Sequence, residues 1–509
     1  MVTSAERRWL LIVSSGVLVL ASLPYVMGAL SATPDWVFTG LQVNPLDGVS
    51  YLAKMRLGFN GSWTFHLVYT VEQGPGAFVY TFYLALGQLA RLFNLPLIVI
   101  FHLARILGGL TVLWLAYHLI ARVTDRIDQR RRAWWLVALS SGLGWLATLL
   151  GHGDSSDMTI PESNTFYSLL TNAHFALAAA IMLAIFIGVF STRRLTGLRL
   201  IGLSGLSLIL AMMQPFASFV LYGILGVALL LIWRRDRLFP RTQSAAAFIA
   251  GLVTAPLLLY IYFAMQADAM LRTWLAQNQT PSPPLIDYAL GYGLLLVTAI
   301  PGARLAWRRR SDWDLLLLAW IVLTALLLYA PIPLQRRLAL GLHLPIAILA
   351  AQGLEQLFRS KWPRRFVMAA TLPTSLLIVL ALFGGAVTHD RHIFISANEA
   401  AAFNWLQINV PPDTVVLAAP ETGAFIPAFA GQRVVYGHPY ETVDADRQKQ
   451  LVTDFFAGRL DRLAMLRAYS INYVLVGPRE RALGQFDAAA LPVRSVYTSG
   501  DVAVYAVEP

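Results

Sequence analysis

The chain has 509 residues, of which 57% are hydrophobic and only 13% are charged. A soluble protein of this length carries roughly twice that charged fraction, so the composition excludes an ordinary soluble enzyme. The net charge of +11 would suit a nucleic-acid-binding protein. However, the arginines cluster in short segments between apolar runs, as the positive-inside rule requires of a membrane protein, and no nucleic-acid partner is expected. The chain has no cysteine, which excludes disulfides and thiol chemistry.

The first apolar run, residues 9–30, follows a Glu-Arg-Arg sequence and predicts a retained span with a cytoplasmic N-terminus. Residues 31–95 are polar and aromatic, with Gly, Pro and Asn punctuation, and predict a long outer loop. Within this loop the amphipathic stretch 78–93 is too short and too interrupted to span the bilayer. We expect it to lie along the membrane surface.

The second span is predicted at residues 96–120, before an arginine-rich segment that the charge rule places in the cytoplasm. Arginine-rich and polar segments then alternate consistently, which predicts about eleven spans and an outer C-terminus in a multi-pass protein of the bacterial inner (cytoplasmic) membrane. The nine further spans are expected at about residues 133–150, 173–190, 200–213, 216–233, 245–265, 288–306, 313–330, 338–358 and 366–387.

The composition changes near residue 388. A helix-like stretch, NEAAAFNWLQ, precedes five short β-branched runs: TVVLAAP, RVVYGHP, INYVLVGP, RSVYTS and VAVYAVEP. This pattern predicts a small α/β domain of about 120 residues. The expected fold class is therefore mainly α, with a polytopic helical bundle (residues 1–387) followed by a small extracytoplasmic α/β domain (residues 388–509).

Ionisable residues in the first outer loop are the first candidates for chemistry. Asp47 precedes a glycine at a predicted helix start, where it either caps the helix or acts as a general base at the membrane surface. Lys54 and Arg56 follow about two turns later and are candidates for binding a phosphate or lipid headgroups. Glu72, just before a Gly-Pro-Gly break, is a second candidate catalytic carboxylate.

The second outer segment, which follows the span ending near residue 150, has acidic residues and no Lys or Arg. Glu162 is a third candidate catalytic carboxylate, with capping as the alternative. His174 lies just inside the next span, where an ionisable group points to function, here substrate binding. No organic cofactor is predicted, and a divalent metal ion is left open because the ligand spacing is not diagnostic. The weak metal-ligand candidates are Asp47, Asp154, Asp157 and His174.

Two adjacent arginines, Arg336 and Arg337, lie on the predicted outer side, against the positive-inside trend. One role for this pair is phosphate binding, since the planar guanidinium group of arginine can donate two parallel hydrogen bonds to a phosphate. The alternative is that the side chains only extend to the polar headgroups at the membrane interface. Arg272 is a weaker phosphate candidate. Carboxylates and arginines on one side of the bilayer suit a lipid-linked anionic substrate: a carboxylate deprotonates an acceptor hydroxyl and the arginines stabilise a phosphate leaving group.

This order of elements, and above all the stretch from Glu72 to Arg122, resembles the GT-C superfamily of integral membrane glycosyltransferases. The similarity covers about residues 1–360 and is to bacterial relatives of protein O-mannosyltransferases and aminoarabinose transferases. It implies inverting transfer of a sugar from a polyprenyl-phosphate donor to a glycan, lipid or protein acceptor. It also implies that Asp47 is the base and that Arg336 and Arg337 hold the lipid phosphate.

Two alternatives stay open at this point. The first is a non-enzymatic transporter or flippase of a lipid-linked glycan, although the chain shows no internal repeat of the kind that transporters often carry. The second is a ligase or polymerase that uses a lipid-pyrophosphate donor. In the C-terminal domain the most site-like stretch is residues 438–441, His-Pro-Tyr-Glu, for which a structural role is the favoured interpretation.

Overall fold

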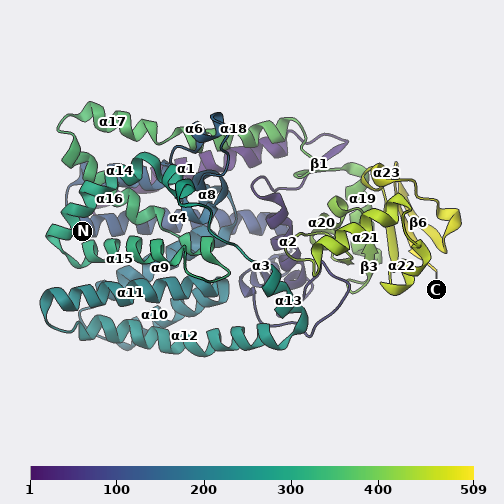
Figure 1. Ribbon diagram of the computed structural model, residues 1–509, viewed down its shortest axis with the longest axis horizontal. Coiled ribbons are helices and arrows are strands. Elements are labelled where there is room, and N and C mark those ends of the chain that lie inside the picture. The colour runs from purple at the N-terminus through teal and green to yellow at the C-terminus, as the bar shows by residue number, and fades with distance from the viewer. Residues whose placement is uncertain (1, 509) are drawn as a thin grey trace. The chain divides into compact units, whose positions relative to one another are not determined.

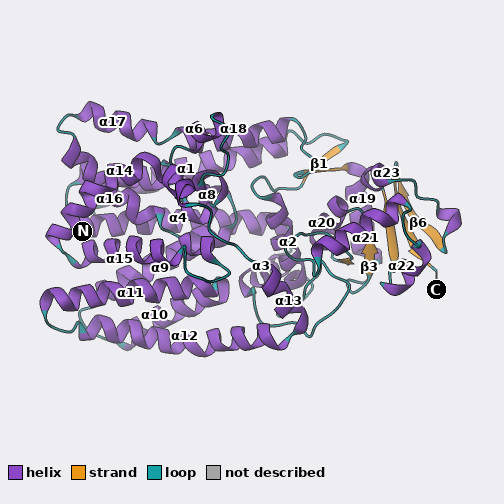
Figure 2. Ribbon diagram, viewed as in Figure 1, coloured by secondary structure: helices purple, strands orange, loops and turns teal. Residues whose placement is uncertain are grey.

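A computed structural model describes residues 2–508, which are mainly helical with a small sheet near the C-terminus (Figure 2). The contacts divide the chain into two compact units. The helical unit contains the residues up to Leu23, His102–Leu259 and Thr280–Leu382. The sheet-bearing unit contains Pro24–Phe101, Tyr260–Gln279 and the residues from Phe383 onward. The predicted division into residues 1–387 and 388–509 stays a prediction.

Seven helical stretches within residues 2–508 are long and apolar enough to cross a membrane (Figure 1). An α-helix rises 1.5 Å per residue, so about 20 apolar residues cover the ~30 Å hydrocarbon core, and the chain is a membrane protein. These stretches are α1 (Ser4–Leu30), α4 (Leu97–Val123), α9 (Ala173–Phe190), α11 (Pro215–Asp236), α12 (Arg241–Ala267), α14 (Leu285–Arg309) and Lys361–Val387, which holds α17 (Lys361–Ala370) and α18 (Pro373–Val387).

Three of the four remaining predicted spans correspond to shorter helices, and the number of about eleven spans stays a prediction. These helices are α10 (Gly197–Met213), α15 (Asp312–Leu327) and α16 (His343–Leu357). The short elements of the helical unit are α7 (Ser156–Thr159), η1 (Pro161–Ser163), α8 (Thr165–Leu170) and η2 (Gln335–Ala339).

Residues 133–150, the fourth remaining predicted span, do not form one helix: α5 (Ile127–Leu139) ends early and α6 (Gly144–Leu149) begins after a break. The buried carboxylate of Asp157 stabilises this break, because it accepts hydrogen bonds from the backbone N–H groups of Gly142 (2.9 Å) and Gly144 (3.3 Å). Between them, Leu143 N–H donates to the Leu290 carbonyl at 2.8 Å. Tertiary partners thus satisfy backbone donors that a continuous helix would have satisfied internally.

A matching irregularity lies inside α14. Gly293 has φ 44° and ψ −120°, a conformation that a residue with a Cβ adopts only under strain. A Cβ at this position would also collide with Leu143. The break between α5 and α6 therefore packs against the kink in α14, and this arrangement depends on glycine.

Residues 31–95, the predicted first outer loop, fold into the sheet-bearing unit. Its strand β1 (Trp36–Phe38) pairs antiparallel with β2 (Phe394–Ser396). The predicted surface stretch 78–93 forms α3 (Thr81–Phe93), which packs closely on α2 (Pro45–Phe59). A Cβ at Gly58 or Gly87 would meet the backbone of the opposite helix, so these two glycines permit the close approach. The same unit contains α13 (Ala269–Gln277).

The five strands predicted in the C-terminal segment are confirmed. They form one sheet with the order β4-β3-β5-β7-β6, in which β4, β3 and β5 are parallel and β7 and β6 antiparallel. The strands are β3 (Val415–Leu417), β4 (Arg433–Val434), β5 (Tyr473–Val476), β6 (Val493–Ser499) and β7 (Val502–Val507). The helices are α19 (Ala397–Asn409), α20 (Pro420–Phe429), α21 (Ala445–Ala457), α22 (Arg462–Ala468) and α23 (Pro478–Leu483), with the short η3 (Ala488–Ala490) before β6.

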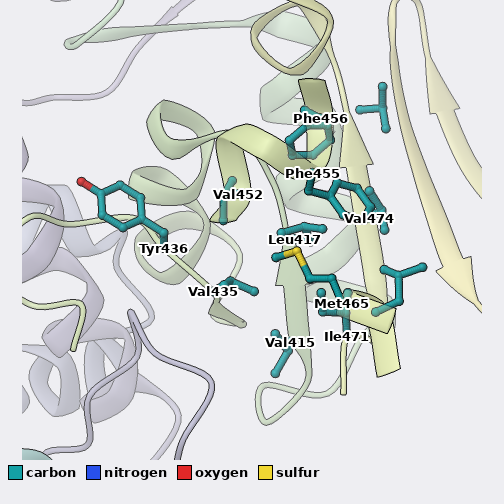
Figure 3. Close-up of a cluster of buried hydrophobic side chains, with 12 residues drawn as sticks. Val415, Leu417, Val435, Tyr436, Val452, Phe455, Phe456, Met465, Ile471 and Val474 are labelled. Atoms are coloured by element: carbon teal, nitrogen blue, oxygen red, sulfur yellow. The ribbon is translucent and has the colours of Figure 1, made fainter. Parts of the chain in front are cut away.

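Figure 3 shows the hydrophobic core of this α/β segment. Leu417 from β3 and Val474 from β5 are fully buried against Phe455 and Phe456 from α21. Strands that are covered on both faces consist of continuous apolar runs. The segments TVVL and YVLV therefore show no alternation of apolar and polar residues. The core fixes the position of the loop that follows β4.

Candidate functional site

Asp47 lies in the first turn of α2, in the sheet-bearing unit. Asn44 precedes the helix in a left-handed conformation and Pro45 occupies the first helical position, where its missing N–H costs nothing. The Asp47 side chain is 49% exposed and makes no hydrogen bond to any residue in the described part of the chain. The capping alternative is therefore not its role here, and the carboxylate is available to a ligand.

His438 is the ionisable group beside Asp47, with its Nε2 4.0 Å from Asp47 Oδ1. It lies in the loop between β4 and α21 and is only 2% exposed. Its Nδ1 accepts hydrogen bonds from the backbone N–H groups of Tyr440 (3.1 Å) and Glu441 (3.2 Å). Burial lowers the pKa of His438, while the Glu441 and Asp47 carboxylates oppose this and the Lys54 ammonium adds to it. The imidazole is therefore neutral at pH 7.

Beneath these two groups lies a buried ion pair. Lys54 Nζ is 2.5 Å from Glu441 Oε1 and donates to Ser50 Oγ at 2.7 Å, and Ser50 in turn donates to Glu441 Oε1 at 2.6 Å. Burial raises the pKa of Glu441, but the Lys54 ammonium, the neighbouring His438 ring and the two hydrogen bonds outweigh it and leave the pKa lowered. The side chain of Lys54 is 1% exposed and lies about 5.2 Å from the ring of Tyr80.

This pairing decides how we assign Lys54. Its charge is already neutralised inside the protein, so we assign the residue to holding the loop of Glu441 against α2 and not to phosphate. Arg56, two residues further along α2, donates to the carbonyls of Ala428 (3.3 Å) and Phe429 (3.4 Å). Both basic residues that the sequence offered for headgroup binding thus join α2 to the C-terminal segment within one unit.

Two other predicted residues of this unit have other surroundings in the structure. Glu72 is exposed in the loop before α3. Arg433 holds that loop by donating to the carbonyl of Val71. Arg272 is exposed on α13, where its Nη1 donates to the Gln266 carbonyl at 3.5 Å. In the described part of the chain no hydrogen bond or ion pair joins either residue to Asp47.

In the helical unit, Arg336 and Arg337 lie half-buried in the short helix η2. The backbone fixes this segment, since Arg336 N–H donates to the Thr280 carbonyl at 3.1 Å. Glu162, in η1, is 9% exposed and its carbonyl accepts from Gly341 N–H at 3.3 Å. Tyr288 lies within electrostatic reach of both Glu162 and Arg336, so the structure brings these two predicted residues near a common hydroxyl.

The surroundings of Glu162 limit what it can bind. It lines a cavity of about 10 Å³ together with Asn164 and His343, and such a cavity holds about one water molecule. Asn164 provides the cap of α8, with its side chain accepting from Tyr167 N–H at 3.1 Å. The expected helix start is confirmed, but Asn164 caps it. The catalytic role of Glu162 stays a prediction.

The weak metal-ligand candidates do not form a metal centre. Within residues 2–508 no group of three His, Asp or Glu side chains could hold an ion. Asp157 already accepts from two glycine N–H groups and from Ser155 Oγ at 2.8 Å, Asp154 is exposed, and His174 is buried with its ring 4.1 Å from the ring of Phe175. The donor set does not fit a preformed site, and we assign no chemical step to a metal.

No protein-family model matches this chain, and no curated protein matches it in sequence. Solved structures do match. ArnT from Cupriavidus metallidurans in the apo state is 13% identical, with 98% of this chain and 100% of that chain covered and a TM-score of 0.55. The same protein bound to undecaprenyl phosphate is also 13% identical, with 97% and 99% covered and a TM-score of 0.55. The chain has the GT-C fold.

The GT-C fold was predicted from the order of elements, whereas His438, Glu441 and Ser50 were not predicted as site residues. The His-Pro-Tyr-Glu stretch was noted, but a structural role was favoured for it. Glu441 meets Lys54 across 387 sequence positions, and no local pattern reveals such a pairing. One feature of the sequence could have identified them. His438 and Glu441 lie in the loop after the predicted strand RVVY, and α/β folds often carry functional groups in such loops.

Proposed function

We propose that this chain transfers a sugar from a polyprenyl-phosphate donor to an acceptor at the outer face of the bacterial inner membrane. The observation that carries the proposal is the fold match to ArnT over almost the whole of both chains, because one of the ArnT structures contains undecaprenyl phosphate. The spans and the exposed carboxylate at the start of α2 support it independently.

Asp47 is our choice for the general base. Its carboxylate is half-exposed, lies on a helix rather than on a mobile loop, and has no hydrogen-bond partner in the described residues. Glu162 lines a cavity too small for a sugar, and Glu72 lies in an exposed loop. A base must reach the proton that it removes, and geometry comes before pKa in this choice.

The proposed reaction is a single displacement at the anomeric carbon. The acceptor oxygen forms a bond to this carbon while the bond from the carbon to the phosphate oxygen breaks, and the electron pair leaves with the phosphate. Asp47 takes the hydroxyl proton. The configuration inverts because the acceptor attacks the face opposite the leaving group.

Arg336 and Arg337 are proposed to hold the lipid phosphate. The phosphodiester of the donor carries one negative charge, and the released polyprenyl phosphate carries up to two. Guanidinium groups that face the phosphate stabilise this growing charge more in the transition state than in the ground state, which is what lowers the barrier.

The test uses the purified protein in lipid nanodiscs with a cell-envelope extract as the acceptor source. Undecaprenyl-phosphate mannose, glucose, galactose and N-acetylglucosamine are supplied one at a time, and released undecaprenyl phosphate is quantified by mass spectrometry. We expect release with one donor, inverted configuration in the product, and loss of at least about 100-fold in the Asp47→Asn variant. Asp35→Asn, an exposed carboxylate of the same loop, is the matched control.

Other outcomes would replace the proposal. Movement of a lipid-linked glycan across vesicle membranes without bond cleavage would identify a transporter or flippase. Release of undecaprenyl pyrophosphate from a pyrophosphate-linked glycan would identify a ligase or polymerase. Unchanged turnover by the Asp47→Asn variant would remove Asp47 from the role of base.

A further inference from the structure

The loop of residues 437–442, which we call the His438 loop, is held firmly beside the start of α2 within the sheet-bearing unit. Gly437 N–H and His438 N–H both donate to Thr442 Oγ1, at 3.4 and 3.2 Å. Thr442 N–H donates to the His438 carbonyl at 3.0 Å, and Gln277 Nε2 donates to the Thr442 carbonyl at 2.6 Å. The Lys54–Glu441 pair ties the loop to α2. The imidazole of His438 therefore has little freedom to move.

The hydrogen bonds of the loop also fix the tautomer of His438. Its Nδ1 accepts from two backbone N–H groups, so this nitrogen carries no proton. In the neutral imidazole the proton must then be on Nε2, which becomes a donor only. Nε2 is buried and makes no hydrogen bond of good geometry within the described residues, although the Leu46 carbonyl lies close enough to act on the pKa of His438 as an acceptor. A buried donor with only a poorly aligned acceptor is costly, which points to a better partner that moves into place.

The groups around Nε2 leave few candidates for that partner. On α2 they are the Asp47 carboxylate, 4.0 Å away, and the neighbouring Leu46 carbonyl, with the Lys54 ammonium deeper in the unit. From its own loop, Glu441 faces His438 but is paired with Lys54. Tyr69 lies with its ring 5.6 Å away and donates its hydroxyl to the Ala424 carbonyl on α20.

We propose that His438 is the positioning residue of Asp47: its Nε2–H donates to Oδ1 and leaves Oδ2 to receive the acceptor proton. The present distance exceeds a hydrogen bond by about 1 Å, and a rotation of the half-exposed Asp47 side chain closes that gap. The part about the acceptor proton rests on the proposed function, whereas the contact between His438 and Asp47 does not. The C-terminal segment thereby completes the site that the first outer loop begins.

Carbodiimide labelling of Asp47 reports this contact without any substrate. A hydrogen bond to a carboxylate stabilises its charged form, so losing the bond increases the protonated, reactive fraction at a given pH. A water-soluble carbodiimide with glycine ethyl ester modifies only the protonated carboxyl, and peptide mass spectrometry follows the modification of Asp47 from pH 3 to pH 7. Glu72, an exposed carboxylate of the same loop, is followed in the same samples as an internal control.

Two variants separate the donor from the loop. His438→Asn keeps an acceptor at the position of Nδ1 but removes the Nε2–H, and His438→Gln keeps a donor near Nε2 but loses the Nδ1 acceptor. We expect the labelling midpoint of Asp47, the pH of half-maximal modification, to move to higher pH in the Asn variant and to stay near the wild-type value in the Gln variant. An unchanged midpoint in the Asn variant, or the same rise in both, overturns the proposal.

A second measurement needs no substitution in the loop. The chain has nine histidines. In protein labelled with ¹⁵N-histidine, one neutral imidazole protonated at Nε2 should change its Nε2 shift when Asp47→Asn is introduced. If no such signal changes, His438 does not contact Asp47.

Activity then distinguishes this inference from the proposed function. With the donor identified above, His438→Asn should lower kcat at least tenfold and leave the KM of the donor unchanged. The acidic limb of the pH profile of kcat/KM should move to higher pH. If the labelling midpoint shifts and no lipid-phosphate sugar is consumed, the contact stands and the proposed function fails. If Asp47→Asn abolishes transfer while His438→Asn leaves kcat and the acidic limb unchanged, the base stands and the positioning role fails.

Discussion

The buried pair of Lys54 and Glu441 offers a sharp test of how the sheet-bearing unit is held together. Removing one partner of a buried ion pair costs about 3–5 kcal/mol, because the other charge is left unpaired. In the Glu441→Gln variant the ammonium keeps Ser50 Oγ and the amide oxygen as acceptors and stays near three aromatic rings. We therefore expect the lower cost of about 2–3 kcal/mol, which is about a 30- to 150-fold increase in local opening.

Limited proteolysis of the protein in nanodiscs measures this opening, since cleavage follows the open population when closing is faster than cleavage. Cleavage within residues 437–445 should accelerate by that factor in Glu441→Gln. The matched control is Glu421→Gln, an exposed carboxylate on α20, which should change cleavage less than about twofold. Cleavage of Glu441→Gln at the wild-type rate would refute the reasoning that this pair holds the loop.

The pH dependence has a defined sign. The folded pKa of Glu441 is lowered from 4.5, so its contribution to stability is present above the unfolded pKa and is lost as the pH falls through the folded pKa. Opening should therefore increase as the pH is lowered below about 4.5. In Lys54→Met the buried carboxyl has no cation, its folded pKa rises, and the loop should instead be more stable at low pH than at neutral pH. A Lys54→Met variant with the wild-type pH dependence would contradict this.

Three further predictions concern the proposed function. Arg336→Gln should raise the KM of the lipid-phosphate donor or lower kcat at least tenfold, measured by the release of undecaprenyl phosphate, whereas Arg359→Gln on a predicted cytoplasmic segment should not. Because the chain has no cysteine, Asp47→Cys and Arg336→Cys can be labelled with a membrane-impermeant maleimide in intact spheroplasts. The charge rule predicts that both are labelled from outside, and labelling from opposite faces would contradict it. Deletion of residues 388–509 should reduce activity more than membrane insertion, measured by transfer assay and membrane fractionation, because it removes Glu441 and His438.

Local composition was sufficient to predict much of the fold. Apolar runs and clustered arginines identified the membrane class, since each depends only on the transfer of nearby side chains into lipid. The five β-branched runs after residue 388 each form a strand. The amphipathic stretch 78–93 forms α3. Asp47, selected for its place at a helix start, lies in the first turn of α2.

Only the tertiary structure decided the features that join distant segments. The apolar run 133–150 has the composition of a single span, yet it forms two helices. The Asp157 carboxylate and the kink at Gly293 stabilise the break between them. Lys54 looked like a headgroup ligand until Glu441, 387 positions away, proved to be its partner. Pairings of this kind depend on where the chain returns in space, so the local pattern of side chains carries no signal for them.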